Sequence, residues 1–163
     1  MHSSLKKRTW VAAAAFILVA AACVSFLVRP TRLILQDVET GKTYASYRLR
    51  ENDTFSVTFV HSVNQSPVTD YYRKGDGNTF ILYATKYHAY GAGIPESWPE
   101  DAVMETSADG IYVTNLHIVL PDVTYIVGTV SDHTLVIGDE TVSLRDLCGR
   151  NAEVLFKLKG GSL

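Results

Sequence analysis

A histidine and an aspartate on either side of a short polar turn are the residues best suited to chemistry in this sequence. They are His61 and Asp70, in the stretch TFVHSVNQSPVTDYY of residues 58–72. If residues 64–67 form a four-residue hairpin loop, the flanking strands place His61 opposite Asp70, with Cβ atoms about 5 Å apart. The spacing therefore predicts a histidine–carboxylate hydrogen bond on one face of a sheet.

Such a pair changes the chemistry of both side chains. A half-buried carboxylate is costly unless it is paired, and its charge raises the pKa of a neighbouring histidine and fixes the tautomer. Three roles fit the pair: a clamp that holds the hairpin, a ligand contact at the rim of the sheet, and an oriented general base. Side chains alternate along a strand, so Ser62 points to the other face and a Ser-His-Asp relay is not predicted.

A second polar cluster lies in KYHAYGAGIP, residues 86–95. Gly91 and Gly93 permit positive φ angles, and successive N–H groups in such a turn can cradle an anion. The stretch lacks the third glycine and the following helix of a dinucleotide-binding fingerprint. The residues that we expect at a binding surface are His61, Ser62, Asp70, His88, Tyr90, Gly91, Gly93 and Pro95.

Charge and motif content exclude several classes of function. The net charge is −2, so no excess of positive charge points to a nucleic acid as the partner. The histidines do not stand at the short spacings of a zinc site, and no P-loop or zinc-protease motif occurs, so we expect no metal, no cofactor and no catalytic residue. Cys23 lies in an apolar segment and Cys148 stands alone in the remainder, so no internal disulfide is expected.

Short apolar runs separated by turn residues dominate the chain after Pro30. Runs such as RLILQDV, TFSVTFVHSV and EVLFKLK are typical of strands, and the breaks ETGK, ENDT, NQSP and KGDGN supply turn residues. About 8–10 such runs predict an all-β fold, an antiparallel sandwich or barrel. The stretch SLRDLCGR, residues 143–150, predicts one helical turn before the last strand. The long break at residues 91–110 predicts either a functional loop or a surface excursion over a sheet edge.

The N-terminal segment WVAAAAFILVAAACVSFLV, residues 10–28, is nineteen residues long and just able to span a bilayer as a helix. Three basic residues precede it, which predicts that residues 1–9 stay in the cytoplasm. We therefore expect a transmembrane signal anchor that holds an extracytoplasmic β domain, residues 31–159, at the cell membrane. Two alternatives remain: cleavage of a signal peptide at the A-x-A pattern before Cys23, which would release the domain, or lipidation of Cys23 itself.

The runs FSVTFVHSVNQSPVTDYY and YHAYGAGIP resemble the DUF1850 family of uncharacterised bacterial and archaeal proteins. A further run, HTLVIGDETVSLRDL, is similar to the C-terminal part of that family. The resemblance covers roughly residues 33–159 and rests on two motifs, His61–Val63 and Gly91–Pro95. It implies a small membrane-anchored or exported domain associated with the permeases of TRAP transporters of the TAXI type, and it brings no catalytic residues.

These observations favour an accessory or binding domain of a solute uptake system. Its expected partners are a transporter permease subunit or a solute-binding protein, with a small solute as a further candidate. A hydrolase-like enzyme that uses His61 as a base oriented by Asp70 is one alternative. A purely structural β module, in which the pair only stabilises the hairpin, is the other. An enzyme needs His61 exposed in a concave pocket beside a nucleophile or a bound water, which distinguishes the two alternatives.

Overall fold

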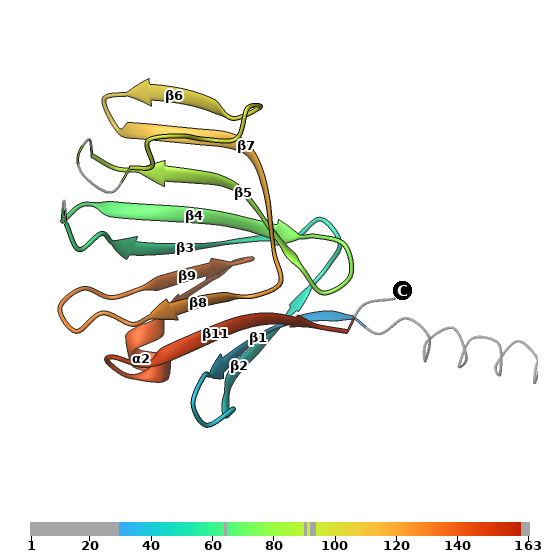
Figure 1. Ribbon diagram of the computed structural model, residues 1–163. Coiled ribbons are helices and arrows are strands. Elements are labelled where there is room, and N and C mark those ends of the chain that lie inside the picture. Colours follow the sequence, from blue (N-terminus) through green and yellow to red (C-terminus); the bar gives the residue numbers. More distant parts are fainter. Residues whose placement is uncertain (1–29, 64, 90, 92–93, 161–163) are drawn as a thin grey trace, which may run out of the picture.

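The computed structural model describes residues 30–160 apart from residues 64, 90, 92 and 93, and this part of the chain is an all-β fold (Figure 1). The strands are β1 (Thr31–Asp37), β2 (Thr43–Leu49), β3 (Thr54–Val60), β4 (Pro67–Lys74), β5 (Phe80–Tyr87), β6 (Val103–Ser107), β7 (Gly110–Leu120), β8 (Val123–Ile126), β9 (Thr134–Ile137), β10 (Glu140–Ser143) and β11 (Glu153–Lys159). One short helix, α2 (Leu144–Cys148), interrupts them. The predicted transmembrane helix at residues 10–28 lies outside the described residues.

The strands form two antiparallel sheets of unequal size, and the predicted all-β class with antiparallel pairing is confirmed. The smaller sheet has the order β2-β1-β11-β8, and the larger has the order β10-β9-β3-β4-β5-β7-β6. Every described strand pair is antiparallel. The arrangement is sandwich-like, and the seven-stranded sheet extends beyond the four-stranded one (Figure 1).

Alternating side chains build one core between the two sheets, because each strand turns every second residue inward. Leu33 and Leu35 of β1 and Phe156 of β11 are fully buried, and Phe55 and Val57 of β3 face them from the larger sheet. We call this cluster the inter-sheet core; its other buried members are Leu49, Tyr72, Phe80, Tyr125, Val127, Leu135, Ile137, Leu144, Val154 and Leu158.

A second cluster covers the part of the larger sheet that the smaller sheet does not reach. We call it the small core; its buried members are Val68, Tyr87, Ile111, Val113 and Leu116. Ile94, Trp98 and Ala102 pack against it from the segment between β5 and β6. The Tyr87 and Trp98 rings meet at an angle of 64° with their centroids 6.0 Å apart. The predicted long break is therefore partly a cover for the inner face of the sheet.

Two local features bear on the sequence predictions. The single helical turn predicted in residues 143–150 is present as α2, where the Ser143 hydroxyl caps the helix by accepting from the Asp146 N–H at 3.0 Å. Strand β6 lies inside the break at residues 91–110, where no strand is predicted. All five of its residues are exposed, so the buried–exposed alternation that marks the other strands is absent.

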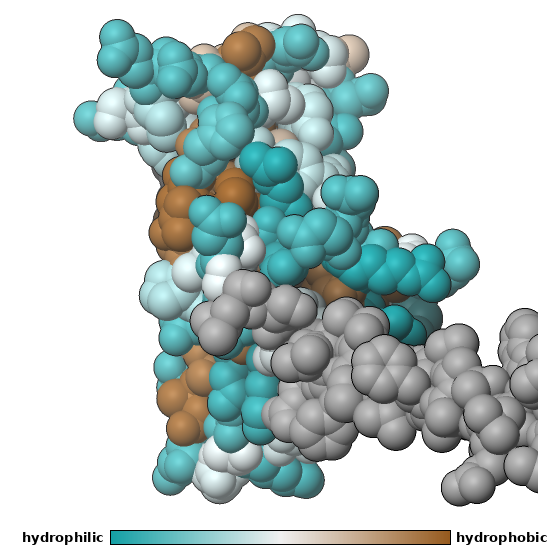
Figure 2. All heavy atoms as spheres, turned by 90° about the vertical axis from the view of Figure 1, so that its right-hand side faces the viewer, coloured by the Kyte–Doolittle hydropathy of each residue, from teal (hydrophilic) through white to brown (hydrophobic). Residues whose placement is uncertain are grey.

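The view in Figure 2 faces the side of the molecule that lies to the right in Figure 1. Its described surface is mostly hydrophilic, and the hydrophobic residues form separate patches among polar ones. Within the residues that the structure describes, no helix has both the length and the apolar character needed to cross a membrane.

Candidate functional site

His61 and Asp70 do not face each other, so the predicted register of the β3–β4 hairpin is wrong. Strand β3 ends at Val60, which pairs with Pro67, and the residue opposite Asp70 is Val57. The loop closes earlier than expected because the His61 N–H donates to the Ser66 carbonyl at 2.9 Å. Residues 61–66 therefore form a six-residue loop, and His61 is its first residue rather than part of the strand.

The Asp70 carboxylate instead lies on the inner face of β4, between the two cores. Val68 of the small core and Tyr72 of the inter-sheet core flank it on the same face, two residues away in each direction. The Thr85 hydroxyl donates to one of its oxygens at 2.9 Å, and the Tyr125 hydroxyl donates to the other at 3.2 Å. The Tyr72 hydroxyl is 3.4 Å from that second oxygen and 2.6 Å from the Tyr125 hydroxyl.

This carboxylate has hydroxyl partners but no described cationic partner. Burial raises the pKa of Asp70, and the hydrogen bonds from Thr85, Tyr125 and Tyr72 only partly offset that rise. Burial, together with the charge of Asp70, raises the pKa of Tyr87 to about 12. Neutral hydroxyl donors satisfy the carboxylate's lone pairs without cancelling its charge. Asp70 is therefore a partly desolvated acid at the boundary between the two cores.

Asp70→Asn is expected to stabilise the domain at high pH and to have little effect at low pH. The ordinary pKa of this carboxyl is 3.8 and its pKa in the folded state is higher, so the folded state keeps the proton up to a higher pH than the unfolded state does. Wild-type stability should then fall as pH rises from 3.8 through the folded pKa, whereas asparagine cannot ionise. Above that range we expect a gain of roughly 1 kcal/mol, measured by urea unfolding at a series of pH values.

The exposed carboxylate Asp122 provides the matched control, since Asp122→Asn removes the same charge without a described buried partner. A stability difference between Asp70→Asn and the wild type that stays constant across the pH series would contradict the assignment.

The first motif forms the loop itself. The His61 Nδ1 accepts from the Val63 N–H at 3.2 Å, and the Ser62 carbonyl accepts from the Gln65 side chain at 2.6 Å. Ser62 is exposed and His61 is partly buried. The ring nitrogen that would meet a carboxylate in a catalytic relay is thus used by the loop's own backbone.

The second motif begins beside the first at the same end of the sheet. The His88 N–H donates to the Pro67 carbonyl at 3.0 Å, and its Nε2 lies 3.3 Å from the Thr69 hydroxyl. Burial, followed by the charge of Lys86, lowers the pKa of His88. The β3–β4 loop and the exit of β5 lie at one end of the larger sheet (Figure 1). Gly91 and Pro95 are exposed, while the predicted residues Tyr90 and Gly93 lie outside the described residues.

The remaining histidines have separate structural positions. His133 is buried and stacks on Phe59 with ring centroids 5.6 Å apart, and burial lowers its pKa. The His117 Nε2 lies 2.7 Å from the Asn115 side-chain oxygen. Across the described part of the chain, no three histidine, cysteine or acidic side chains gather closely enough to hold a metal ion.

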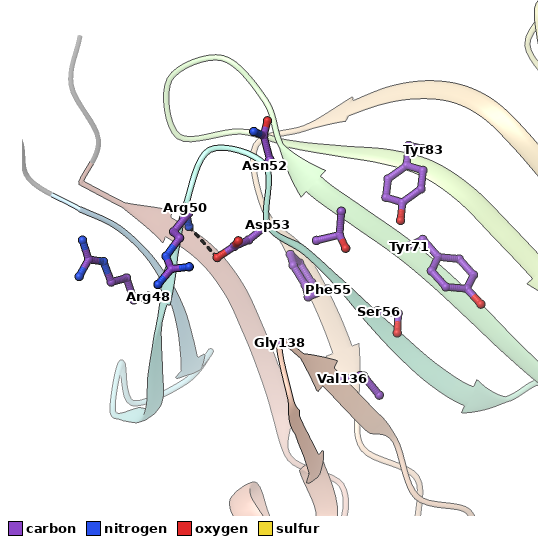
Figure 3. A pocket seen from close by; sticks show the side chains of 11 residues that line it. Arg48, Arg50, Asn52, Asp53, Phe55, Ser56, Tyr71, Tyr83, Val136 and Gly138 are labelled. Atoms are coloured by element: carbon purple, nitrogen blue, oxygen red, sulfur yellow. Dashed lines mark hydrogen bonds between the residues drawn. The ribbon is translucent and has the colours of Figure 1, made fainter.

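The outer face of the larger sheet carries a feature that sequence reasoning missed. An open hollow of about 660 Å³ lies there, and we call it the outer hollow. Figure 3 shows Arg48, Arg50 and Asp53 on one side of it and Tyr71 and Tyr83 on the other. The rest of its lining is Asn52, Thr54, Phe55, Ser56, Val136 and Gly138. Both arginines are exposed, and the Asp53 carboxylate accepts the Arg50 backbone N–H at 2.9 Å.

Two further hollows continue the outer hollow across the same face. One shares Thr54 and Tyr83 with it and adds Arg73, while the other shares Tyr71 and lies beside Tyr112. The Tyr71 ring centroid is 6.2 Å from that of Tyr83 and 5.9 Å from that of Tyr112, so the three tyrosines form one cluster.

Strand β7 contributes a strained segment to the middle of this face. Asn115 and His117 have φ angles of 60° and 50°, and both line the hollow that contains Arg73. Such conformations are uncommon for residues other than glycine and gather at functional sites. A binding site on the outer face would therefore include strained backbone at its edge.

A sequence signal for the outer hollow does exist. The stretch RLREND places Arg48 and Arg50 two residues apart, which puts both guanidinium groups on one side of an extended chain. Tyr71 and Tyr83 stand on the outer faces of neighbouring strands, but their proximity depends on the β4–β5 register and its irregularity after Tyr71.

Residues 55–144 match the family described as Domain of unknown function (DUF1850). No curated protein and no solved structure was found to match the chain. The matched region runs from β3 to the first residue of α2 and contains both sequence motifs and most of the outer face.

Proposed function

The chain belongs to the DUF1850 family, and on that premise we propose that it is an extracytoplasmic accessory domain of a solute uptake system. Residues 10–28 anchor it in the cell membrane, and the β domain lies outside. Its work is binding: contact with the permease subunit or the solute-binding protein of a TRAP transporter of the TAXI type, or capture of a small solute for it.

The outer face of the seven-stranded sheet is the observation that supports this proposal best. Tyr71, Tyr83 and Tyr112 are partly exposed there, and three open hollows adjoin them. Tyrosine and arginine are enriched in binding surfaces, because each offers a large apolar area together with hydrogen-bonding groups. A broad and shallow face of this kind is more typical of a binding surface than of a catalytic site, which is usually an enclosed pocket.

The hydrolase alternative required a hydrogen bond between His61 and Asp70, and the two side chains have separate partners. The Asp70 oxygens accept from Thr85, Tyr125 and Tyr72, and the His61 Nδ1 accepts from a backbone N–H. A base needs an orienting partner and a nearby proton to remove. At His61 the described residues supply no carboxylate partner, so binding is the function that we favour.

Membrane co-purification from the native host tests the proposal. We expect tagged full-length chain, solubilised in mild detergent, to recover a transporter permease subunit or a solute-binding protein, identified by mass spectrometry. Lys86→Glu changes a charge at the end of β5, in the hollow beside the β6–β7 turn on the outer face, and should lower the recovery several-fold. Lys42→Glu changes the same charge in the β1–β2 turn and should leave the recovery unchanged. Repeated purification of the wild-type chain without any transporter subunit would contradict the proposal.

A further inference from the structure

We propose that the outer hollow binds a small organic anion that has a carboxylate at one end and a flat apolar body at the other. This inference rests on the proposed function, since it names the class of solute that an accessory domain of an uptake system would bind. The geometry points to it through three properties of the hollow: its charge, its aromatic wall and its size.

The charge comes from arginines that no described carboxylate neutralises. Arg48 and Arg50 are exposed, and neither forms an ion pair with a described residue. The ion pair found in the described part of the chain joins Lys74 and Glu51. Asp53 lies nearby, but its carboxylate accepts a backbone N–H rather than a guanidinium group. The exposed Arg50 guanidinium, with Arg48 beside it at the rim of the hollow, favours a carboxylate, whose two oxygens match the planar fork of an arginine.

This local charge runs against the charge of the whole chain, which is −2. A concentration of positive charge at one hollow of an otherwise acidic protein attracts small anions to that hollow. The adjoining hollow adds Arg73, but the described residues of this face do not form the continuous row of cations that a nucleic acid backbone requires. The hollow that contains Lys86 also contains Glu105 and Asp109, so the positive end of the face lies at Arg48 and Arg50.

The opposite wall is aromatic. The Tyr71 and Tyr83 planes are inclined at 49°, so the two rings do not stack on each other. Val136 on the floor is 38% exposed, and no hydrogen bond of the Ser56 hydroxyl is found among the described residues. An apolar body between these groups would contact the rings, while its carboxylate would reach Arg50 on the opposite side of the hollow. Figure 3 shows the Arg48 guanidinium pointing away from the tyrosines.

The size of the hollow agrees with a small ligand. Its volume of about 660 Å³ falls in the range of small-molecule sites, which is about 300–1,000 Å³. The hollow is open to solvent on the outer face, so much of a bound ligand stays hydrated. We therefore expect affinity in the millimolar to micromolar range rather than tight capture.

Phenylacetate is a suitable probe, and phenylacetamide is its neutral counterpart. We expect the full chain in non-ionic detergent to bind phenylacetate saturably in an isothermal titration, and to bind phenylacetamide at least about tenfold more weakly, because charge-assisted bonds to arginine are lost. The double variant Arg48→Gln/Arg50→Gln should lose affinity for phenylacetate by about the same factor. Arg150→Gln, an exposed arginine away from the hollow, should bind phenylacetate like the wild type.

A second pair of variants keeps both arginines and tests the location. Val136→Glu places a negative charge on the floor of the hollow, whereas Val136→Gln adds a side chain of the same size without charge. We expect Val136→Glu to bind phenylacetate more weakly than Val136→Gln does. Unchanged thermal unfolding midpoints of all variants would show that each one is folded.

Three results would overturn the inference: no saturable binding of phenylacetate in the millimolar range, equal affinity for the amide, or equal affinity in Val136→Glu and Val136→Gln. Failure of the site and failure of the proposed function can be told apart. A chain that recovers a transporter subunit but does not bind phenylacetate overturns only the site. A chain that binds phenylacetate through its arginines but recovers no subunit overturns only the transporter link.

Discussion

Gly110→Ala is expected to destabilise the domain by about 3 kcal/mol or more. A Cβ at this position would lie 2.0 Å from the Tyr87 carbonyl oxygen and 2.9 Å from the His88 Cα, both backbone atoms that cannot turn aside. Its φ of +116° is also one that L-residues rarely adopt. Equilibrium urea unfolding of the full chain, followed by tryptophan fluorescence, would measure the loss of stability.

Gly77→Ala is the matched control for this prediction. Gly77 has a φ of +61° but nothing within 4 Å of the added Cβ, so only conformational strain is introduced, about 1–2 kcal/mol. Equal destabilisation by both substitutions would contradict the steric argument. The result concerns function as well as folding, because Gly110 contacts the chain where β5 leads into the Gly91–Pro95 motif.

Phe156→Ala should be comparably severe, with an expected loss of about 3–5 kcal/mol. Phe156 is fully buried in β11, and its ring centroid lies 6.3 Å from that of Phe55 and 5.5 Å from that of Tyr125. Since Phe55 belongs to the larger sheet, the substitution opens a cavity between the sheets. Domains of this kind are stable by only about 5–15 kcal/mol, so the unfolding midpoint should fall sharply.

Glu153→Ala on the same strand provides the comparison. Glu153 is exposed at the start of β11, and removing its side chain should change stability by no more than about 0.5 kcal/mol. A Phe156→Ala variant that unfolds at nearly the same urea concentration as Glu153→Ala would show that the two sheets do not depend on this contact.

The fold class could be predicted from local pattern. The alternation in TFSVTFV gives β3, and the KGDGN break falls where β4 turns into β5. The same alternation continues through His61 in the sequence, and nothing in it marks Val60 as the end of the strand. That end is set by the hydrogen bond from His61 to Ser66, which closes a six-residue loop.

The wrong prediction that His61 faces Asp70 follows from the misplaced end of β3. Shifting the loop changes which residue stands opposite Asp70, since register depends on loop length. The actual partners of Asp70 come from β5 and from Tyr125 of β8, which belongs to the other sheet. Counting along one hairpin cannot identify partners that depend on how two sheets pack. The outer hollow was missed for the same reason, because its walls come from β2–β3, β4 and β5.

The position of β11 has a consequence for the order in which the domain assembles. Leu33 of β1 pairs with Leu158 of β11, so the earliest and latest described strands are neighbours, with β11 between β1 and β8. While the chain is being synthesised, β1 can pair with β2, but nearly all of the remaining sequence must follow before the other edge of β1 is covered. Until then the apolar face of the smaller sheet stays open. Completion of the domain is thus coupled to delivery of its last strand, and folding should be slow for its size.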